Sequence, residues 1–321
     1  MIKKCLEPCP VCGNVEWHLI LQRGVFKEDH TERVFDIVQC HDCGLGRTEP
    51  LLSYKELEPF YTDEYWHQTP ALPGINMSLI SRLQQRFIDV RLYATIKPIL
   101  EKMTKGSRIL DVGCGSGDVL RLMVKSGLTV SGVEPAKQAA EFAQRTFGSN
   151  VIQGTLEESA YPEGAFDGAT LLHVLEHVPD PFNTLVEICR VIKPCGLILI
   201  EVPNITSWGF RVFRERWHPL DIPFHLYHFS PYALEKLVQR VGFRIKRRSY
   251  FSARASCASW ALSLFPSLDP RRLRRIESKN RATTFKLIYL AVQLLTWPIA
   301  FLSATVKHGD VVSILAEKHA T

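Results

Sequence analysis

A glycine-rich loop followed by an acidic residue is the part of this sequence best suited to bind a charged cofactor. Apolar residues lead into Asp111, and glycine then recurs at every second position, at Gly113, Gly115 and Gly117. Glycine lets a backbone adopt positive φ and approach a ligand closely, and a helix beginning after the loop presents unpaired N–H groups. Glu134 ends the next apolar segment, where a carboxylate can accept hydrogen bonds from ribose hydroxyls. The pattern predicts a nucleoside-type cofactor.

The spacing of the glycines narrows the choice of cofactor. A dinucleotide-binding loop has the spacing G-x-G-x-x-G, but Asp118 stands at its third glycine position and the spacing here is G-x-G-x-G. With Asp111, the loop resembles the first motif of the class I S-adenosylmethionine (SAM) methyltransferases. The resemblance implies that the loop binds SAM and that Glu134 holds its ribose.

Further elements follow in the order of that family. Gly154, Thr155 and Leu156 match the turn that covers the adenine, and residues 166–172 resemble the fourth strand, which leads into His173 and His177. Residues 190–201 resemble the turn and fifth strand. The implied fold is α/β, a Rossmann-like seven-stranded sheet. The SAM-binding residues implied by the resemblance are Asp111, Gly113, Gly115, Gly117, Glu134, Gly154, Thr155, Leu156 and His173.

Two cysteine pairs near the start of the chain predict a metal site. Cys9 and Cys12 form one C-x-x-C-G motif, and Cys40 and Cys43 form another. Four thiolates on two such turns make the tetrahedral cage that zinc prefers, with no open position, so the metal is expected to be structural. Disulfide bonds are the alternative, which a reducing compartment disfavours. Cys5 has no assigned role.

The chain divides by its patterns into four parts. A zinc ribbon with a β-hairpin is expected at 1–48, and a connector at 49–104 with a helix at 78–102 packed over the cofactor cleft. Tyr61 or Tyr65 of the connector would line the substrate pocket or pack against the ribbon. The SAM-binding domain is expected at 105–251 and 309–321, with its last two strands at 243–250 and 310–316.

A zinc ribbon joined to a SAM domain resembles bacterial sugar and polysaccharide methyltransferases, including C-methyltransferases of nucleotide-linked deoxysugars. Those proteins carry an E-H-x-x-x-F-S segment, and here Phe224 replaces the glutamate before His225. This departure favours methylation at oxygen, with His225 as the candidate base. In the alternative, His225 and His228 tie a loop together by hydrogen bonds. His177 either supports the cofactor loop or contacts the substrate.

The fourth part is an insertion at 252–308 between the last two strands. It contains a cluster of arginines at 271–275 and an apolar segment at 287–306 with no charged residue. Because both flanking strands are expected in one sheet, the insertion must leave and return on the same side, which excludes a single membrane crossing. It is expected either to contact the membrane peripherally, where basic residues favour anionic lipid, or to form a cap or a dimer contact.

Composition and charge agree with an ordinary soluble enzyme. The 321 residues are 46% hydrophobic and 22% charged, with a net charge of +6, and no signal-like apolar run follows Met1. A cytoplasmic protein, peripheral on the inner face of the membrane, is expected. The favoured function is O-methylation of a small-molecule or lipid-linked sugar. The alternatives are a polyprenyl quinone precursor and RNA, although no nucleic acid is expected because basic residues do not alternate with stacking aromatics.

Overall fold

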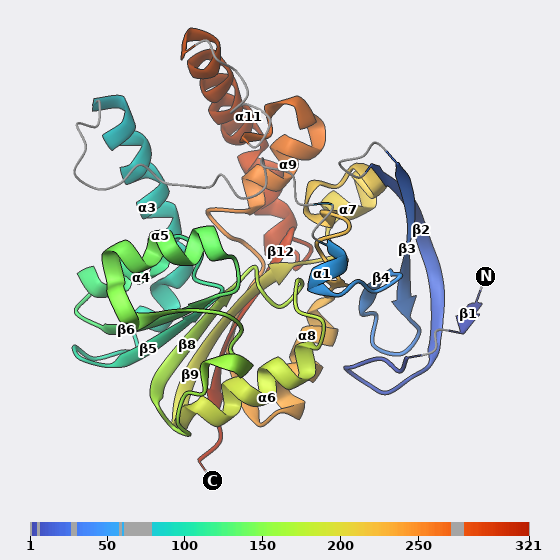
Figure 1. Ribbon diagram of the computed structural model, residues 1–321. Helices are drawn as coiled ribbons and strands as arrows, with labels where there is room; N and C mark the ends of the chain where they lie inside the picture. Colours follow the sequence, from blue (N-terminus) through green and yellow to red (C-terminus); the bar gives the residue numbers. More distant parts are fainter. Residues whose placement is uncertain are drawn as a thin grey trace.

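The structure is a computed structural model that describes residues 2–4, 7–26, 31–57, 60, 79–270 and 279–320. Two sheets lie side by side, a large one built from the middle and end of the chain and a smaller one built mainly from its start (Figure 1). Cys5, Tyr61, Tyr65 and the arginines at 271–275 fall outside the described residues.

The large sheet has seven strands in the order β11-β12-β9-β8-β5-β6-β7. The five strands from β5 to β9 run parallel, and β12 pairs antiparallel with both β9 and β11. This is the order of a class I methyltransferase sheet and confirms the predicted fold class. The strands are β5 (Arg108–Val112), β6 (Thr129–Glu134), β7 (Val151–Gln153), β8 (Phe166–Leu172), β9 (Ile192–Pro203), β11 (Phe243–Ser249) and β12 (Val311–Lys318).

Helices cover both faces of the large sheet, with α4 (Asp118–Lys125) and α5 (Lys137–Phe147) on one side and α6 (Pro181–Val191) and α8 (Pro231–Arg240) on the other (Figure 1). Each helix buries an apolar stripe, as an amphipathic helix on a sheet must; in α4 the stripe includes Leu120 and Met123. Asp180 and Ser230 cap α6 and α8 by accepting hydrogen bonds from N–H groups of the first turn.

The small sheet draws its strands from two distant parts of the sequence. Its order is β1-β2-β3-β4-β10, and all its pairings are antiparallel. The first four strands come from the cysteine-rich start of the chain, but β10 (Tyr227–His228) arrives from the segment around His225. The other strands are β1 (Ile2–Lys4), β2 (Glu16–Phe26), β3 (Glu32–Cys40) and β4 (Gly46–Glu49), followed by the short helix α1 (Tyr54–Leu57).

The connector helix α3 (Leu79–Leu100) forms within the predicted range 78–102 but does not pack as the sequence predicted. It packs against α4 and β9, and none of its described side chains, at residues 86–100, lines the cavity described below. Arg91 ties it to the insertion, because its Nη1 donates to Gln293 Oε1 at 2.7 Å and its Nε donates to the carbonyl of Ala253. The helix therefore holds the insertion in place.

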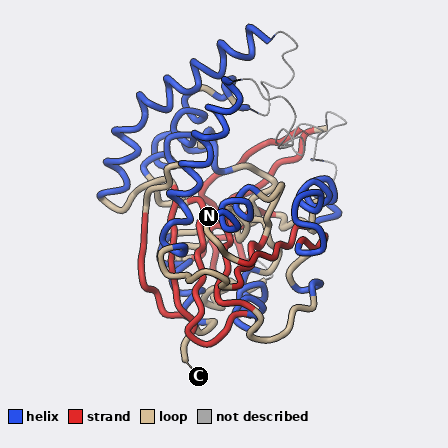
Figure 2. The backbone as a smooth tube through the Cα atoms, turned by 90° about the vertical axis from the view of Figure 1, so that its left-hand side faces the viewer, coloured by secondary structure: helices blue, strands red, loops and turns tan. Residues whose placement is uncertain are grey.

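The described part of the insertion contains the α-helices α9 (Ser256–Leu264) and α11 (Lys279–Thr305), which pack against one another. Helix α9 also contacts the short helix α7 (Trp208–Phe213). Helix α11 continues through Pro298 without a break. Figures 1 and 2 show helices at the top of the molecule, and Figure 1 labels α11 among them, with its upper turns away from the strands. Among the described residues, only Leu287–Thr305 is long and apolar enough for a membrane span, by length and composition, with a mean hydropathy of 1.8.

Candidate functional site

The glycine loop closes tightly after β5. Gly113, Gly115 and Gly117 all have positive φ, of 66°, 53° and 87°. A Cβ on Gly113 would lie 2.5 Å from Val174, and one on Gly117 would lie 2.6 Å from Phe147, whereas one on Gly115 would meet no atom within 4 Å. Two of the glycines are therefore required for packing as well as for backbone conformation.

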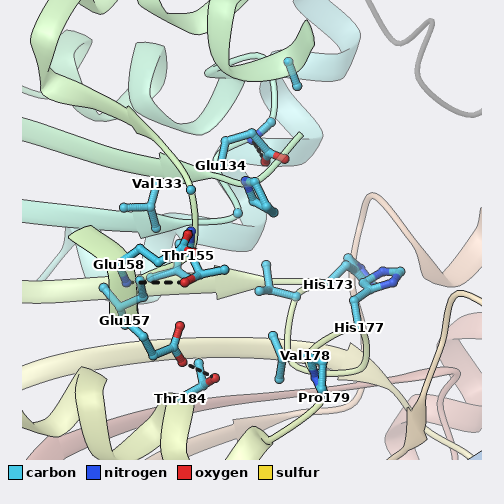
Figure 3. A pocket seen from close by; sticks show the side chains of 18 of the residues that line it. Val133, Glu134, Thr155, Glu157, Glu158, His173, His177, Val178, Pro179 and Thr184 are labelled. Atoms are coloured by element: carbon cyan, nitrogen blue, oxygen red, sulfur yellow. Dashed lines mark hydrogen bonds between the residues drawn. The ribbon is translucent and has the colours of Figure 1, made fainter. Parts of the chain in front are cut away.

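A cavity of about 690 Å³ opens at the carboxyl ends of β5, β6 and β8, where parallel α/β sheets place their ligands (Figure 3). Eight of the predicted site residues line it, and Asp111, Gly117 and His225 do not. The predicted residues in the lining are Gly113, Gly115, Glu134, Gly154, Thr155, Leu156, His173 and His177.

Glu134 fixes the loop from the end of β6. Its carboxylate accepts hydrogen bonds from the N–H of Gly115 at 2.8 Å and of Ala136 at 2.9 Å. Burial raises the pKa of this carboxyl, and the two backbone bonds oppose that effect. Each carboxylate oxygen keeps further acceptor capacity, so Glu134 can bind ribose hydroxyls from the cavity side.

Asp111 acts inside the sheet and not on the cavity surface. It is buried, and its carboxylate accepts a 2.6 Å hydrogen bond from Thr170 Oγ1 on the neighbouring strand β8. Burial raises the pKa of Asp111 to about 7. The side chain therefore supports the loop from behind.

The end of the cavity near the turn at Gly154–Leu156 is suited to bind a nucleobase. The N–H of Gly154 donates to the carbonyl of Glu134 at 3.0 Å, and Leu156 is buried beneath the turn. Figure 3 shows Thr155 and Glu158 joined by a hydrogen bond on this side, while His173 and His177 lie close together on the opposite side. A cofactor with an adenosine at one end and a reactive group at the other fits this layout, as SAM requires.

His173 carries a positive charge between two buried acids. Its Nδ1 lies 3.3 Å from Glu176 Oε1 and its Nε2 lies 3.2 Å from Glu201 Oε1. Burial alone would lower the pKa of His173, but the two carboxylates outweigh it and raise that pKa to about 9. Burial likewise opposes ionisation of Glu176, yet His173 holds the pKa of Glu176 at about 2.

His177 and His225 form an edge-to-face pair at the side of the cavity. Their ring centroids lie 4.5 Å apart, and each Nδ1 is paired with a backbone carbonyl, His177 with Phe224 at 3.0 Å and His225 with Pro219 at 2.8 Å. Burial and the neighbouring His177 lower the pKa of His225 to about 4. His177 reaches the cavity surface, while His225 lies directly behind it.

The small sheet holds this histidine segment. The N–H of Thr48 in β4 donates to the carbonyl of Leu226 at 2.9 Å, and its hydroxyl lies 3.0 Å from His228 Nε2. Ser230 Oγ donates to the carbonyl of Cys43 at 3.1 Å. Neither Thr48 nor Glu176 stands out in the sequence, because their roles depend on contacts between distant segments.

The four paired cysteines gather at one point of the small sheet. The Sγ atoms of Cys9 and Cys43 lie 3.5 Å apart, as do those of Cys12 and Cys40, and all four lie within 4.8 Å of one another. None of the four is in a disulfide. A Zn–S distance of about 2.3 Å implies tetrahedron edges of about 3.8 Å, so the four sulfurs could hold a metal. The Cys43 thiol lowers the pKa of Cys9 to about 5 by hydrogen bonding.

Some lining residues carry no recognisable motif. Phe142 and Gln138 come from α5, and Asn183 comes from α6, which pack on opposite faces of the sheet. Their only signal in the sequence is a position near the start of helices that follow β6 and β8: Gln138 and Asn183 lie in the first turn, and Phe142 lies in the second.

Comparison with known proteins points to one chemistry. Residues 83–247 match a family described as a methyltransferase domain. The ubiquinone biosynthesis O-methyltransferase of Vibrio parahaemolyticus is 35% identical over 115 residues, covering 33% of this chain and 49% of that protein. Its counterpart in Thiobacillus denitrificans is 30% identical over 132 residues, covering 39% and 52%. The chain spans about half the length of the curated relatives it matches.

Among solved structures the sequence identity is lower. A SAM-dependent methyltransferase from Archaeoglobus fulgidus is 22% identical, with a TM-score of 0.49 over 75% of this chain and 100% of that one. The curated relatives are named for ubiquinone biosynthesis and not for sugar methylation, so they agree with the predicted alternative acceptor better than with the favoured one.

Proposed function

The chain belongs to the methyltransferase-domain family matched over residues 83–247, and on that premise we propose that this SAM-dependent methyltransferase acts on the hydroxyl of a polyprenyl-borne phenol, the class of compound from which quinones are made. The names of the curated relatives support the phenol and the transfer to oxygen. The membrane part of the proposal depends on α11.

The burial pattern of α11 is the observation that best supports the proposal of a lipid-borne acceptor. Among the described side chains of α11, the buried ones are small or polar: Gln293, Thr296, Ala300 and Ser303. Its outward positions are large and apolar, with Leu294 64% exposed and Leu295 79% exposed. A helix on a soluble protein shows the opposite distribution, and an outward face of this kind is typical of contact with lipid or protein.

Charge and topology favour a position in the membrane interface. No charged residue occurs between Lys286 and Lys307, and no acidic residue occurs from 279 to 307. Basic residues at the ends of an apolar helix can reach lipid head groups. Because β11 and β12 pair in one sheet, the insertion leaves and returns on one side, so α11 lies along the surface of a bilayer and does not cross it.

The residues of the cavity have different roles in the proposed methyl transfer. SAM supplies a methyl group already activated by its sulfonium. Glu134 holds the ribose and the turn at Thr155 covers the adenine, so that the other end of the cofactor faces His173 and His177. Alignment of the acceptor oxygen with the methyl group supplies much of the rate. His177 is placed to meet the acceptor hydroxyl, and His225 lies behind it in edge-to-face contact with its ring.

We also assign a structural zinc ion to Cys9, Cys12, Cys40 and Cys43. The donor set of four thiols and the sulfur spacing support that metal. The ion would stabilise the small sheet, which in turn fixes the histidine segment through β10.

One labelling experiment tests the acceptor. The purified protein is incubated with methyl-labelled SAM and anionic vesicles that carry a polyprenyl catechol, a polyprenyl-phosphate sugar or neither, with total RNA as a separate substrate. Label is expected in the catechol alone, and Glu134→Ala should abolish it. Label in the lipid-linked sugar would refute a phenolic acceptor but would still support a lipid-borne one. Label in RNA would refute both parts of the proposal.

A further inference from the structure

We propose that Glu201 is a positioning residue for methyl transfer, which fixes the ring of His173 at the wall of the SAM cavity. Glu201 lies near the end of β9 and is buried, and His173 follows β8, the parallel neighbour of β9, and lines the cavity. The Nε2 of His173 lies 3.2 Å from Glu201 Oε1, and its Nδ1 lies 3.3 Å from Glu176 Oε1. Both ring nitrogens are therefore engaged, so His173 acts by its position and charge and not as a base.

The backbone of His173 shows that its surroundings hold this residue in place. Its φ is +58°, in the left-handed region that a residue with a side chain rarely adopts. Such a conformation persists only where neighbouring groups impose it, and it is typical of functional sites. The N–H of His173 donates to the backbone carbonyl of Glu201 at 2.8 Å. Glu201 thus holds both the backbone and the ring of His173.

The burial of the Glu201 carboxylate indicates a role in function more than in stability. Glu201 stands inside the sheet between Ile200 and Val202, opposite Ser313 of β12, and only 2% of it is exposed. Removing an ionised side chain from water is costly, and replacing a buried ion pair by apolar residues is often neutral or stabilising. What the carboxylate provides here is a fixed partner for an imidazole at the edge of the cavity.

The insertion contributes the group that orients this carboxylate. Ser252 is buried at the start of the insertion, and its Oγ donates to Glu201 Oε1 at 2.9 Å. Thr95 Oγ1 on α3 lies 3.4 Å from the same serine hydroxyl. The position of His173 therefore depends on contacts that begin outside the cavity. Ser252→Ala should cause the same changes as Glu201→Gln, in a weaker form.

The charge of His173 gives these contacts a measurable consequence. A protonated imidazole has two N–H donors and serves both carboxylates, whereas a neutral one has a single donor and must release one of them. Because the two carboxylates raise the pKa of His173 to about 9, both contacts are complete at neutral pH and one is lost as the pH rises through that value. Glu134 and His177 line the same cavity, and His225, whose pKa is lowered to about 4, stays neutral behind His177.

Imidazole NMR of the full-length protein tests the contact without any acceptor. The resonance of His173 is assigned by its absence in His173→Gln, and in the unsubstituted protein it should titrate near pH 9. In Glu201→Gln it should titrate about 1–3 pH units lower, because one of its two anionic partners is now neutral. Asp310→Asn is the matched control, since it removes a buried carboxylate just before the neighbouring strand β12, where the partner is Trp217.

Kinetics test the role in transfer, which rests on the proposed function. The rate is measured with whichever acceptor of the labelling experiment takes up label, so a different acceptor overturns the proposed phenol and leaves this test intact. Glu201→Gln should lower kcat about 10–100-fold and leave the Kd for SAM within about twofold, since a misplacement of about 1 Å can cost roughly 100-fold in rate. The fall in rate at high pH should move to lower pH together with the titration of His173. Asp310→Asn should change neither.

A double variant shows whether Glu201 acts through His173. If it does, Glu201→Gln combined with His173→Gln should transfer methyl groups as fast as His173→Gln alone, because the two substitutions remove one shared contact. Losses that multiply would overturn the positioning role. An unchanged titration of His173 in Glu201→Gln would overturn the contact, and a lowered titration with an unchanged kcat would overturn its part in transfer.

Discussion

The hydroxyl of Thr48 donates a 2.7 Å hydrogen bond to the backbone carbonyl of His225, which lies 177 residues further along the chain. The first residue belongs to the cysteine-rich sheet and the second to the edge of the SAM cavity. This contact, with the pairing of β4 and β10, places the small sheet directly behind the wall of the cavity. The cysteine cluster can therefore affect methyl transfer without touching the cofactor.

Thr48→Val tests this connection, because valine keeps the shape of threonine and removes its hydroxyl. We expect a loss of about 1–3 kcal/mol of unfolding free energy, since the buried groups of His225 and His228 lose a partner. Methyl transfer should fall while the Kd for SAM stays within about twofold. Thr104→Val, at an exposed position outside the cavity lining, is the control. Equal losses of SAM binding and transfer would refute a positioning role.

Glu134→Gln should weaken SAM binding by about 10–100-fold, because charge-assisted hydrogen bonds contribute roughly 1.5–3 kcal/mol. Calorimetric titration with SAM or its demethylated product measures the change. The exposed Glu141→Gln on α5 removes the same charge outside the cavity and should bind normally. A normal affinity in the Glu134 variant would mean that the ribose lies elsewhere.

The raised pKa of Asp111 predicts that the stability of the fold depends on pH. Its pKa rises from 3.8 to about 7 on folding, so between those values the folded chain binds a proton that the unfolded chain does not. Stability should therefore fall as the pH rises from about 4 to 7 and level off above it, by at most about 4 kcal/mol at 1.36 kcal/mol per pKa unit. Asp111→Asn should lack this decline in thermal melts without SAM. A variant that keeps the full decline would assign it to another group.

Removal of the proposed structural zinc should abolish methyl transfer while the SAM cavity persists. Elemental analysis should find about one zinc per chain at the cysteines, and Cys9→Ser or Cys40→Ser should lose it and lower Tm. Cys195→Ser is the matched control, because that cysteine is exposed and lies outside the cluster. If the metal-free variants transferred methyl groups at the normal rate, the small sheet would have no part in the acceptor site.

Helix α11 predicts binding to anionic membranes. Leu294→Ser with Leu295→Ser should reduce cosedimentation with phosphatidylglycerol vesicles at least 10-fold and leave Tm unchanged, because both side chains are exposed. Val186→Ser on α6 removes an exposed apolar side chain elsewhere and should bind vesicles normally. Concentration-dependent dimerisation that the double variant abolishes, without vesicle binding, would show that α11 contacts a second copy of the chain.

The parts of the fold that follow local patterns could be predicted from the sequence. The strands of the large sheet, the glycine loop and the apolar insertion each leave a periodic or motif signal within a few residues. The position of α3 and the pairing of β10 with β4 could not, because they depend on which surfaces meet after folding. For the same reason the sequence indicates His177 and His225 as separate candidates, and only the structure places their rings 4.5 Å apart with Glu176.

The pairing of β4 with β10 also has a consequence during synthesis of the chain, because β4 is made long before β10. Thr48 and His228 are separated by 180 residues, and a ribosome adds about 5–20 residues per second. The backbone groups of β4 that later pair with β10 therefore stay unpaired for about 10–40 s after the cysteine pairs have emerged. An unpaired strand edge of this kind can pair with other chains, so the nascent protein is most exposed to aggregation in the interval before its own C-terminal half is made.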